Sequence, residues 1–384
     1  MRVETIVERV LGKWRDKIHA KRLAAVLAVV AGIVRAERLS LSRVGRALAS
    51  KAKPKHSIKR VDRLLSNGAF HRERWDHFAA MAHFLLADVQ RPVIVVDWTK
   101  VVGDFHALYA AVPVGGRTQT VYFEVHPERR TETRTVHDRF LRALRDVLPP
   151  GCRPIIVTDA GFHRLFFREV LRLGWDFVGR LRGRATMRPQ AQPQQWTSVH
   201  LLYLRATTVA TSLGFFSLYK KVASLRVRLV LIRHRRKGGH RWRRRLSADH
   251  SSTMTGAKEP WLLATSLEGA EAAEIVRCYA TRMQIEESFR DAKNHRFGWS
   301  LRHVRCSSRM RLESLLVLSM LATLAVTLLG MAVERAQLHR GFQANTVKTR
   351  VLSHFFLGLA YLSAFSPPPI TVFLRIHSVS ALER

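Results

Sequence analysis

The pattern of hydrophobic and polar positions divides the chain into a helical first part and a mixed second part. Apolar residues recur at helical spacing over residues 19–35 and 39–49, and again within a basic segment, residues 55–67. Apolar positions three and four residues apart are typical of helices that bury one face. We therefore predict a helical N-terminal domain over residues 1–85.

From about residue 91 the pattern becomes that of strands. Short apolar runs at residues 92–96 and 154–157 precede Asp97 and Asp159, and such uninterrupted runs indicate buried central strands. Between them the sequence predicts a hairpin around Gly115-Gly116. Because crossover connections are right-handed, the fourth strand should lie beside the first. Both aspartates are then expected at the carboxyl ends of neighbouring strands.

The remaining segments complete the predicted organisation. The chain after Leu181 contains Pro- and Gln-rich sequence and short strands, and helical periodicity resumes near Glu271, with breaks near Gly298 and Gly341. The predicted parts are a helical domain (1–85), an α/β core in two pieces (90–181 and 266–345), a β-rich insertion (182–265) and a helical C-terminal region (346–384).

The net charge of the chain indicates what kind of molecule it binds. Lys and Arg number 65 against 29 Asp and Glu, which gives a net charge of +36 and a pI near 11.5. Such an excess repels itself unless a polyanion neutralises it, and nucleic acid is the usual one. An arginine-rich composition inherited from a GC-rich genome is the alternative. The three cysteines are far apart, which argues against a zinc knuckle or a disulfide scaffold and fits a reducing cytoplasm.

One segment has the length of a membrane span. Residues 314–333 run for 20 residues without a charge. Charged residues flank the segment, Ser, Thr and Gly interrupt it, and no second segment of this kind exists. We predict a buried helix of a large domain and no membrane association, with a single-span membrane protein as the alternative.

Two basic segments are candidate DNA contacts. The basic helix that follows a turn at Pro54 carries Lys59, Arg60 and Arg63, and a helix, short turn and basic helix is the outline of a helix-turn-helix reader. A solvated pair of basic helices is an equally good interpretation. In the insertion, an arginine-rich loop is predicted to contact phosphates rather than only solvent. Its candidate residues are Arg241, Arg243 and Arg244.

Residues 271–294 read as one helix with two distinct faces. Ile285 and Phe289 lie on a face that can pack on the sheet. At about 100° per residue, the other face collects a phenol, cations and a carboxylate within roughly 60°. These residues are Tyr279, Arg282, Glu286 and Lys293, with Arg290 beside them. Glu287 falls off this face, so the pattern selects Glu286 as the inward acid.

Two strand-end aspartates and one helical glutamate make three carboxylates able to meet at one point. Carboxylates repel one another unless a cation lies between them, and hard oxygen ligands suit Mg²⁺ or Mn²⁺. Asp97, Asp159 and Glu286 are therefore the candidate ligands of two such ions. The alternative is structural: the aspartates cap turns, and Glu286 pairs with Arg282 or Arg290.

These motifs resemble those of a known family. The spacing of Tyr279, Arg282, Glu286 and Lys293 is similar to the signature of family-four bacterial insertion-sequence transposases, which are hairpin-forming DDE transposases. The strings VDWTK (96–100), VTDAGFHR (157–164), EPWLLATSL (259–267) and FQANTV (342–347) resemble the transposon-ten group, as do KRLAAV (21–26) and KHSIKRVDRLLSN (55–67). The resemblance covers the chain to about residue 350.

The resemblance implies a fold and an activity. The fold is α/β, an RNase H-like core interrupted by a β-strand insertion, with an N-terminal region that binds transposon ends. The activity is cut-and-paste transposition with Asp97, Asp159 and Glu286 holding two Mg²⁺ ions, for which Mn²⁺ can substitute. One strand is nicked, the new 3′-OH forms a hairpin, water opens it, and the 3′-OH joins target DNA. A domesticated or decayed element that only binds DNA is the alternative.

The resemblance also implies partners and further contacts. Partners are double-stranded DNA, as terminal inverted repeats and target, and a second copy of the chain in a synaptic dimer. Three residues would contact the DNA phosphates near the cleaved end, namely Tyr279, Arg282 and Lys293. Trp261 would stack on a base that is flipped out of the duplex. From the sequence alone, Trp261 is better explained as a core residue at the start of a strand. The expected location is the bacterial cytoplasm, in association with the nucleoid.

Overall fold

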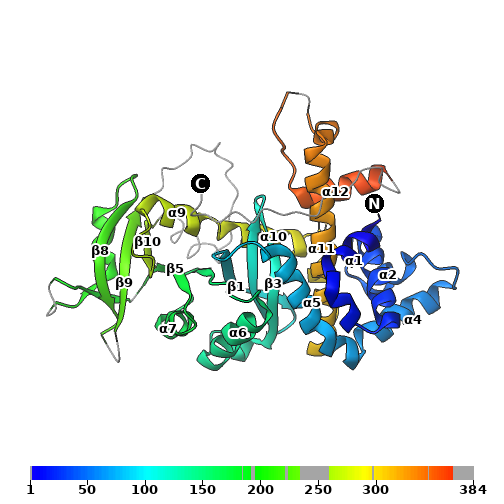
Figure 1. Ribbon diagram of the computed structural model, residues 1–384, viewed down its shortest axis with the longest axis horizontal. Helices are drawn as coiled ribbons and strands as arrows, with labels where there is room; N and C mark the ends of the chain where they lie inside the picture. The colour runs from blue at the N-terminus through cyan, green and yellow to red at the C-terminus, as the bar shows by residue number, and fades with distance from the viewer. Residues whose placement is uncertain are drawn as a thin grey trace, which may run out of the picture. The chain divides into compact units, whose positions relative to one another are not determined.

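The computed structural model describes residues 2–183, 185–191, 195–220, 224–233, 259–295, 298–344 and 346–365. The chain forms two compact units, each with its own core (Figure 1). Unit 1 is assigned Met1–Cys152 and Met283–Val379, and unit 2 is assigned Arg153–Arg282 and Ser380–Arg384. Asp97 and Glu286 therefore belong to unit 1, and Asp159 belongs to unit 2.

The N-terminal part of unit 1 is helical, as predicted. Its helices are α1 (Val3–Leu11), α2 (Ala20–Ala36), α3 (Leu41–Arg46), α4 (Pro54–Leu65) and α5 (Gly68–Leu86), with a 3-10 helix, η1 (Gly12–Lys17). Pro54 opens α4, where its missing N–H costs no hydrogen bond. Val61, Leu64 and Leu65 form the buried side of α4.

Three antiparallel strands follow, in the spatial order β3-β2-β1. They are β1 (Val93–Val102), β2 (Phe105–Val114) and β3 (Arg117–Pro127). Gly115 and Gly116 have φ of 58° and 88°, a conformation that glycine adopts without steric cost. The predicted hairpin is confirmed.

The predicted end of the first strand is wrong. β1 does not stop at Asp97 but continues to Val102, so Asp97 lies in the middle of the strand. The apolar run ends at Asp97 because both faces of the strand are buried only up to that point. Beyond it, buried Thr99 and Val101 alternate with exposed Lys100, the pattern of an antiparallel strand with one solvated face.

Helices cover the sheet of unit 1. α6 (Arg134–Val147) packs on it through Phe140, whose ring lies 5.0 Å from that of Tyr122. The short 3-10 segment η2 (Glu128–Arg130) precedes α6. After α10 (Met283–Lys293), the helices are α11 (Arg309–Arg335) and α12 (His354–Ala364), with the 3-10 segments η5 (Leu301–His303) and η6 (Leu338–Phe342). The described C-terminal residues are therefore partly helical, and residues 366–384 lie outside the described part of the chain.

α11 is the core helix of unit 1. It is long and apolar enough to cross a membrane, but 89% of its 18-residue apolar window is buried inside the protein. Its buried Glu313 accepts hydrogen bonds from Arg309 (2.8 Å) and pairs with His71 of α5 (2.6 Å). A polar group buried with such partners ties α11 to α5. The prediction of a buried helix is confirmed.

Unit 2 is built on a mixed sheet in the order β4-β5-β10-β9-β8-β6-β7. β4 and β5 are parallel, and the other pairings described in this unit are antiparallel. The strands are β4 (Ile155–Thr158), β5 (Asp176–Leu181), β6 (Thr186–Pro189), β7 (Thr197–Ser198), β8 (Thr211–Leu218), β9 (Leu225–Ile232) and β10 (Trp261–Thr265). The helices are α7 (Arg164–Arg172), the 3-10 helix η3 (Val199–Arg205) and α9 (Ala272–Ala280).

The prediction of short strands in the insertion is confirmed for the described residues, although η3 was not expected. α7 packs on the sheet at Gly179, where a Cβ would lie 2.4 Å from the ring of Phe167. Arg241, Arg243 and Arg244 lie outside the described residues, so their predicted phosphate contacts stay predictions.

The prediction of one continuous helix over residues 271–294 is wrong. α9 ends at Ala280 and α10 begins at Met283. The amides of Thr281 and Arg282 bond three residues back, and the Thr281 hydroxyl donates to the Cys278 carbonyl at 2.7 Å. These bonds end the i to i−4 ladder, as Thr side chains do at helix ends. The four signature residues therefore divide between two helices, Tyr279 on α9 and both Glu286 and Lys293 on α10, with Arg282 between them.

Candidate functional site

In unit 1, Asp97 lies on the sheet face that carries α10. Asp97 pairs across the strands with Tyr109, and Thr99 pairs with Ala107. Directly opposed residues of antiparallel strands project to the same face. The ring of Tyr109 lies 5.2 Å from that of Phe289 on α10. Asp97 and Thr99 therefore project toward the α10 side of the sheet.

α10 is fixed to this sheet by side-chain contacts. Ile285 is 1% exposed, and the Ser288 hydroxyl accepts the Thr118 N–H at 2.8 Å. Arg117 donates from Nε to Asp291 at 2.6 Å. Burial and hydrogen bonding together set the rotation of α10, so the predicted packing of Ile285 on the sheet is confirmed.

Lys293 reaches the strand of Asp97 from the last turn of α10. Its Nζ donates to the Thr99 hydroxyl at 2.5 Å. Burial lowers the pKa of Lys293, the positive charge of Arg302 lowers it further, and the nearby Asp97 carboxylate opposes both. A cation held beside Asp97 in this way can meet a phosphate there. The sequence interpretation missed Thr99, although its position two residues after Asp97 on a strand would have identified it.

Glu286 and Glu287 have different surroundings. Glu287 accepts from Arg290 at 2.7 Å and lies 3.9 Å from Arg117. Glu286 is half-buried in the first turn of α10, seven residues and so about two helical turns before Lys293. Arg290, exposed on the surface, pairs with Glu287. The selection of Glu286 over Glu287 as the site acid stays a prediction.

In unit 2, Asp159 directly follows β4, as predicted. Its Oδ1 accepts the Gly161 N–H at 2.9 Å, so the loop backbone holds one oxygen of the carboxylate. The side chain is half-buried. One oxygen is thus committed to the loop, as in an Asx turn.

Tyr279 and Trp261 form an aromatic pair in unit 2. Their ring centroids are 4.8 Å apart at an interplanar angle of 76°. Tyr279 is 3% exposed, and burial raises the pKa of its hydroxyl. Tyr279 is therefore buried on α9 and not exposed as the helical pattern predicted, and its proposed contact with DNA stays a prediction. Trp261 begins β10 and is half-buried, which fits its interpretation as a strand-start residue.

The three candidate carboxylates suit a hard cation, but neither unit contains all three of them. Within each unit, over the residues that the structure describes, no group of three or more His, Cys, Asp or Glu side chains could hold a metal ion. Asp97, Asp159 and Glu286 are all carboxylates, the ligand type that Mg²⁺ and Mn²⁺ prefer. Two of them come from unit 1 and the third from unit 2.

The predicted basic helix presents its cations to solvent. Lys59, Arg60 and Arg63 of α4 are exposed. Lys59 pairs with Asp62 at 2.8 Å, and the same aspartate pairs with Arg311 of α11 at 2.8 Å. α4 is thus anchored to the core helix on one side and basic on the other. This geometry is compatible with both a DNA-reading helix and a solvated one.

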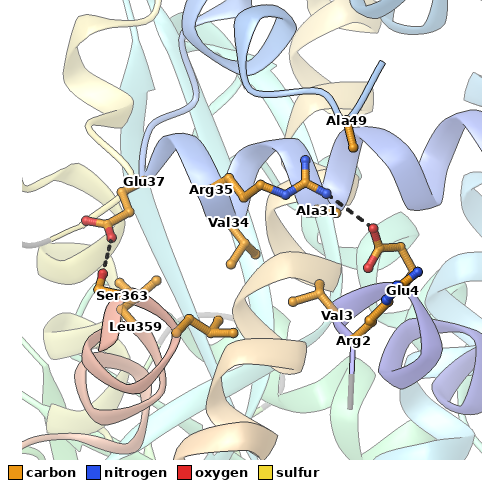
Figure 2. A pocket seen from close by; sticks show the side chains of 11 residues that line it. Arg2, Val3, Glu4, Ala31, Val34, Arg35, Glu37, Ala49, Leu359 and Ser363 are labelled. Carbon is orange, nitrogen blue, oxygen red and sulfur yellow. Dashed lines mark hydrogen bonds and ion pairs between the residues drawn. The ribbon is translucent and has the colours of Figure 1, made fainter. Parts of the chain in front are cut away.

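A cavity of about 500 Å³ in unit 1 lies away from the candidate acids, between the N-terminal helices and α12. Figure 2 shows two polar contacts along its wall: Arg35 pairs with Glu4 at 3.3 Å, and Ser363 donates to Glu37 at 3.2 Å. Asp97, Asp159 and Glu286 do not line it.

Comparison with known proteins identifies the family. A family model described as a transposase DDE domain matches residues 89–324, which is more than half of the chain. The chain belongs to this family. It is therefore an enzyme that acts on DNA in transposition, with an RNase H-like α/β core. No curated protein matches the chain.

Proposed function

We propose that the protein catalyses cut-and-paste transposition of an element of the transposon-ten group, with Asp97, Asp159 and Glu286 as the metal-binding acids. The observation that carries this proposal is the match to the transposase DDE domain, which includes all three residues. Two features of unit 1 support it: Asp97 projects to the α10 side of the sheet, and Lys293 bonds to Thr99 beside it.

The proposed chemistry is phosphodiester cleavage followed by strand transfer. Two Mg²⁺ ions bound by these acids would activate the attacking oxygen and stabilise the leaving one. The chain's own cations position the DNA: Lys293 meets the phosphate beside Asp97, and Arg282 contacts a neighbouring one.

The Trp261–Tyr279 pair is proposed to serve the hairpin step. A hairpin end is strained, and flipping out one base relieves the strain if an aromatic ring replaces the lost stacking, worth about 1–3 kcal/mol per base. Trp261 is half-buried against Tyr279, which would give such a ring a fixed orientation. Tyr279 would then act through Trp261 and not on a phosphate directly.

The proposed role in cut-and-paste transposition also defines the proposed partners. The exposed basic side of α4 would bind the terminal inverted repeats, and two copies of the chain would bring two ends together with target DNA. The protein would act in the bacterial cytoplasm, bound to the nucleoid.

Nicking of supercoiled plasmid carrying an element end tests the catalytic assignment. With Mg²⁺ the wild-type protein should nick and then release linear DNA. Asp97→Asn, Asp159→Asn and Glu286→Gln should each reduce cleavage at least about a thousandfold, because each removes a charged ligand while keeping its size. Binding to the end in a gel shift should persist.

Glu287→Gln is the matched control, since it alters the neighbouring acid on the same helix. It should cleave within a few-fold of wild type. Cleavage at the wild-type rate by any one of the three carboxylate variants would remove that residue from the proposed site.

A further inference from the structure

Trp98, which follows Asp97 on β1, connects this acid to the other face of the sheet. Its backbone N–H donates to Oδ1 of Asp97 at 2.8 Å. Successive side chains of a strand project to opposite faces, so the Trp98 side chain projects away from the α10 side. That face carries α6, which Figure 1 shows below β1 and β3. There the Trp98 indole donates from Nε1 to Nε2 of His137 at 3.1 Å.

His137 on α6 is a buried acceptor for the Trp98 indole. It is 6% exposed, and the centroids of the two rings are 6.1 Å apart. The indole is half-buried, and a donor that leaves water without a partner destabilises the fold. Any rotation of the indole would break this bond. His137 therefore fixes the direction of the Trp98 side chain and, through it, the backbone beside Asp97.

A polar network behind the sheet holds the Trp98 indole from a second side. The ring of His126 on β3 lies 5.8 Å from the indole at an interplanar angle of 68°. His126 is 3% exposed and donates from Nε2 to Glu124 at 2.8 Å. Glu124 also accepts from Tyr122 at 2.7 Å and from Arg139 of α6 at 2.5 Å. Buried groups with several bonds among them rigidify a core, so β3 and α6 together fix the surroundings of Trp98.

β1 is held from both faces at the candidate acid. On the α10 side, Thr99 accepts from Lys293 at 2.5 Å, and on the α6 side Trp98 donates to His137. Asp97 precedes these two anchored residues. Packing alone would not need the second contact, since Trp14 of η1 is buried in the same unit and its indole N–H bonds to no residue that the structure describes.

We propose that Trp98 is a positioning residue for the Asp97 carboxylate, with His137 of α6 as its anchor. The bond from the Trp98 N–H fixes the side-chain torsion of Asp97, so the carboxylate meets a divalent ion already ordered. Trp98 acts through Asp97 and makes no contact with DNA in this role. That Asp97 binds metal rests on the proposed function.

The metal requirement of the full chain bound to an element-end duplex tests this role. Electron paramagnetic resonance measures the affinity for Mn²⁺, and nicking at increasing Mg²⁺ gives the half-saturating concentration. Trp98→Phe and His137→Leu should each weaken Mn²⁺ binding and raise the half-saturating Mg²⁺ concentration roughly tenfold, because groups that orient a metal ligand typically contribute about 10–100-fold in affinity. At saturating Mg²⁺, nicking should return to within a few-fold of the wild-type rate.

His137→Gln and Trp14→Phe are the matched controls. The glutamine carbonyl can accept the indole N–H of Trp98, so His137→Gln should keep the metal requirement within a few-fold of wild type. Trp14→Phe removes an indole N–H that bonds to no described residue and should leave the metal requirement unchanged. Nuclear magnetic resonance of isotope-labelled protein reports the anchor itself. The indole N–H signal that Trp98→Phe removes should move upfield and exchange faster with solvent in His137→Leu.

The outcomes separate positioning from stability and from catalysis. Folded Trp98→Phe and His137→Leu proteins with the wild-type Mn²⁺ affinity overturn the positioning role, even if the wild type nicks plasmid. A lower melting temperature with an unchanged metal requirement also overturns it, because Trp98 would then only stabilise unit 1. A wild type that binds Mn²⁺ more tightly than Asp97→Asn but never nicks contradicts only the catalytic proposal.

Discussion

Single residues carry most of the chemistry in this protein, and their surroundings distinguish one acid or cation from its neighbour. Glu286 and Glu287 are adjacent, yet only Glu287 pairs with Arg290. Arg226 and Arg228 lie on the same strand face, yet Arg228 is occupied by backbone carbonyls. In both pairs, neighbouring residues of the same type make different contacts within the fold.

His77 on α5 makes the stability of unit 1 depend on pH. It is fully buried, and its ring nitrogens bond to no residue that the structure describes. Burial lowers its pKa from 6.5 to about 4. Between these values the unfolded chain binds the proton and the folded protein does not. Unfolding should therefore become easier as the pH falls from 6.5 to 4, by at most roughly 3 kcal/mol.

Urea unfolding at several pH values between 6.5 and 4 measures this effect. His77→Leu should flatten the dependence, whereas His56→Gln, an exposed histidine on α4, should preserve it. An equal slope for wild type and His77→Leu would assign the pH dependence to other groups.

Much of the residue-level assignment could be made from the sequence, and its failures have physical causes. The position of Asp159 after an apolar run was correct because β4 is buried on both faces. Asp97 was misplaced relative to its strand end because an apolar run ends where burial becomes one-sided, not where the strand ends. The helix over residues 271–294 was predicted as continuous because helical periodicity cannot show that Thr281 and Arg282 interrupt it.

At the scale of elements, close approaches between helices are fixed by small residues. A Cβ on Gly45 of α3 would lie 2.5 Å from the Cα of Ile58 on α4. The backbones of the two helices of the proposed DNA reader thus approach each other closely at this glycine. Periodicity predicted both helices, but not the contact between them, because that contact depends on a residue with no side chain.

Gly45→Ala should separate α3 from α4. Because the added methyl meets backbone atoms, we expect a loss of about 1–3 kcal/mol of stability and weaker binding to element ends. Gly68→Ala is the control, since its Cβ would have only an ordinary contact, 3.7 Å from Arg72. Thermal unfolding and gel shifts measure both effects, and a Gly45→Ala protein with unchanged stability would contradict this packing.

At the scale of the whole molecule, the proposed chemistry joins two units that fold around separate cores. Asp97, Glu286 and Lys293 belong to unit 1, and Asp159, Tyr279 and Arg282 belong to unit 2. The net charge of +36 favours binding of DNA. The sequence predicted the charge and the acids, but not that the signature residues divide between units, because that division depends on long-range packing.

The central claim is that acids from both units bind the same metal ions during cleavage. Replacing Asp97 or Asp159 by cysteine tests it most directly, because a thiolate binds Mg²⁺ poorly but binds the softer Mn²⁺. Both Asp97→Cys and Asp159→Cys should be inactive with Mg²⁺ and regain nicking with Mn²⁺, whereas Asp97→Ala and Asp159→Ala should stay inactive with either ion. Rescue of one cysteine variant but not the other, or equal activity in both metals, would contradict the claim.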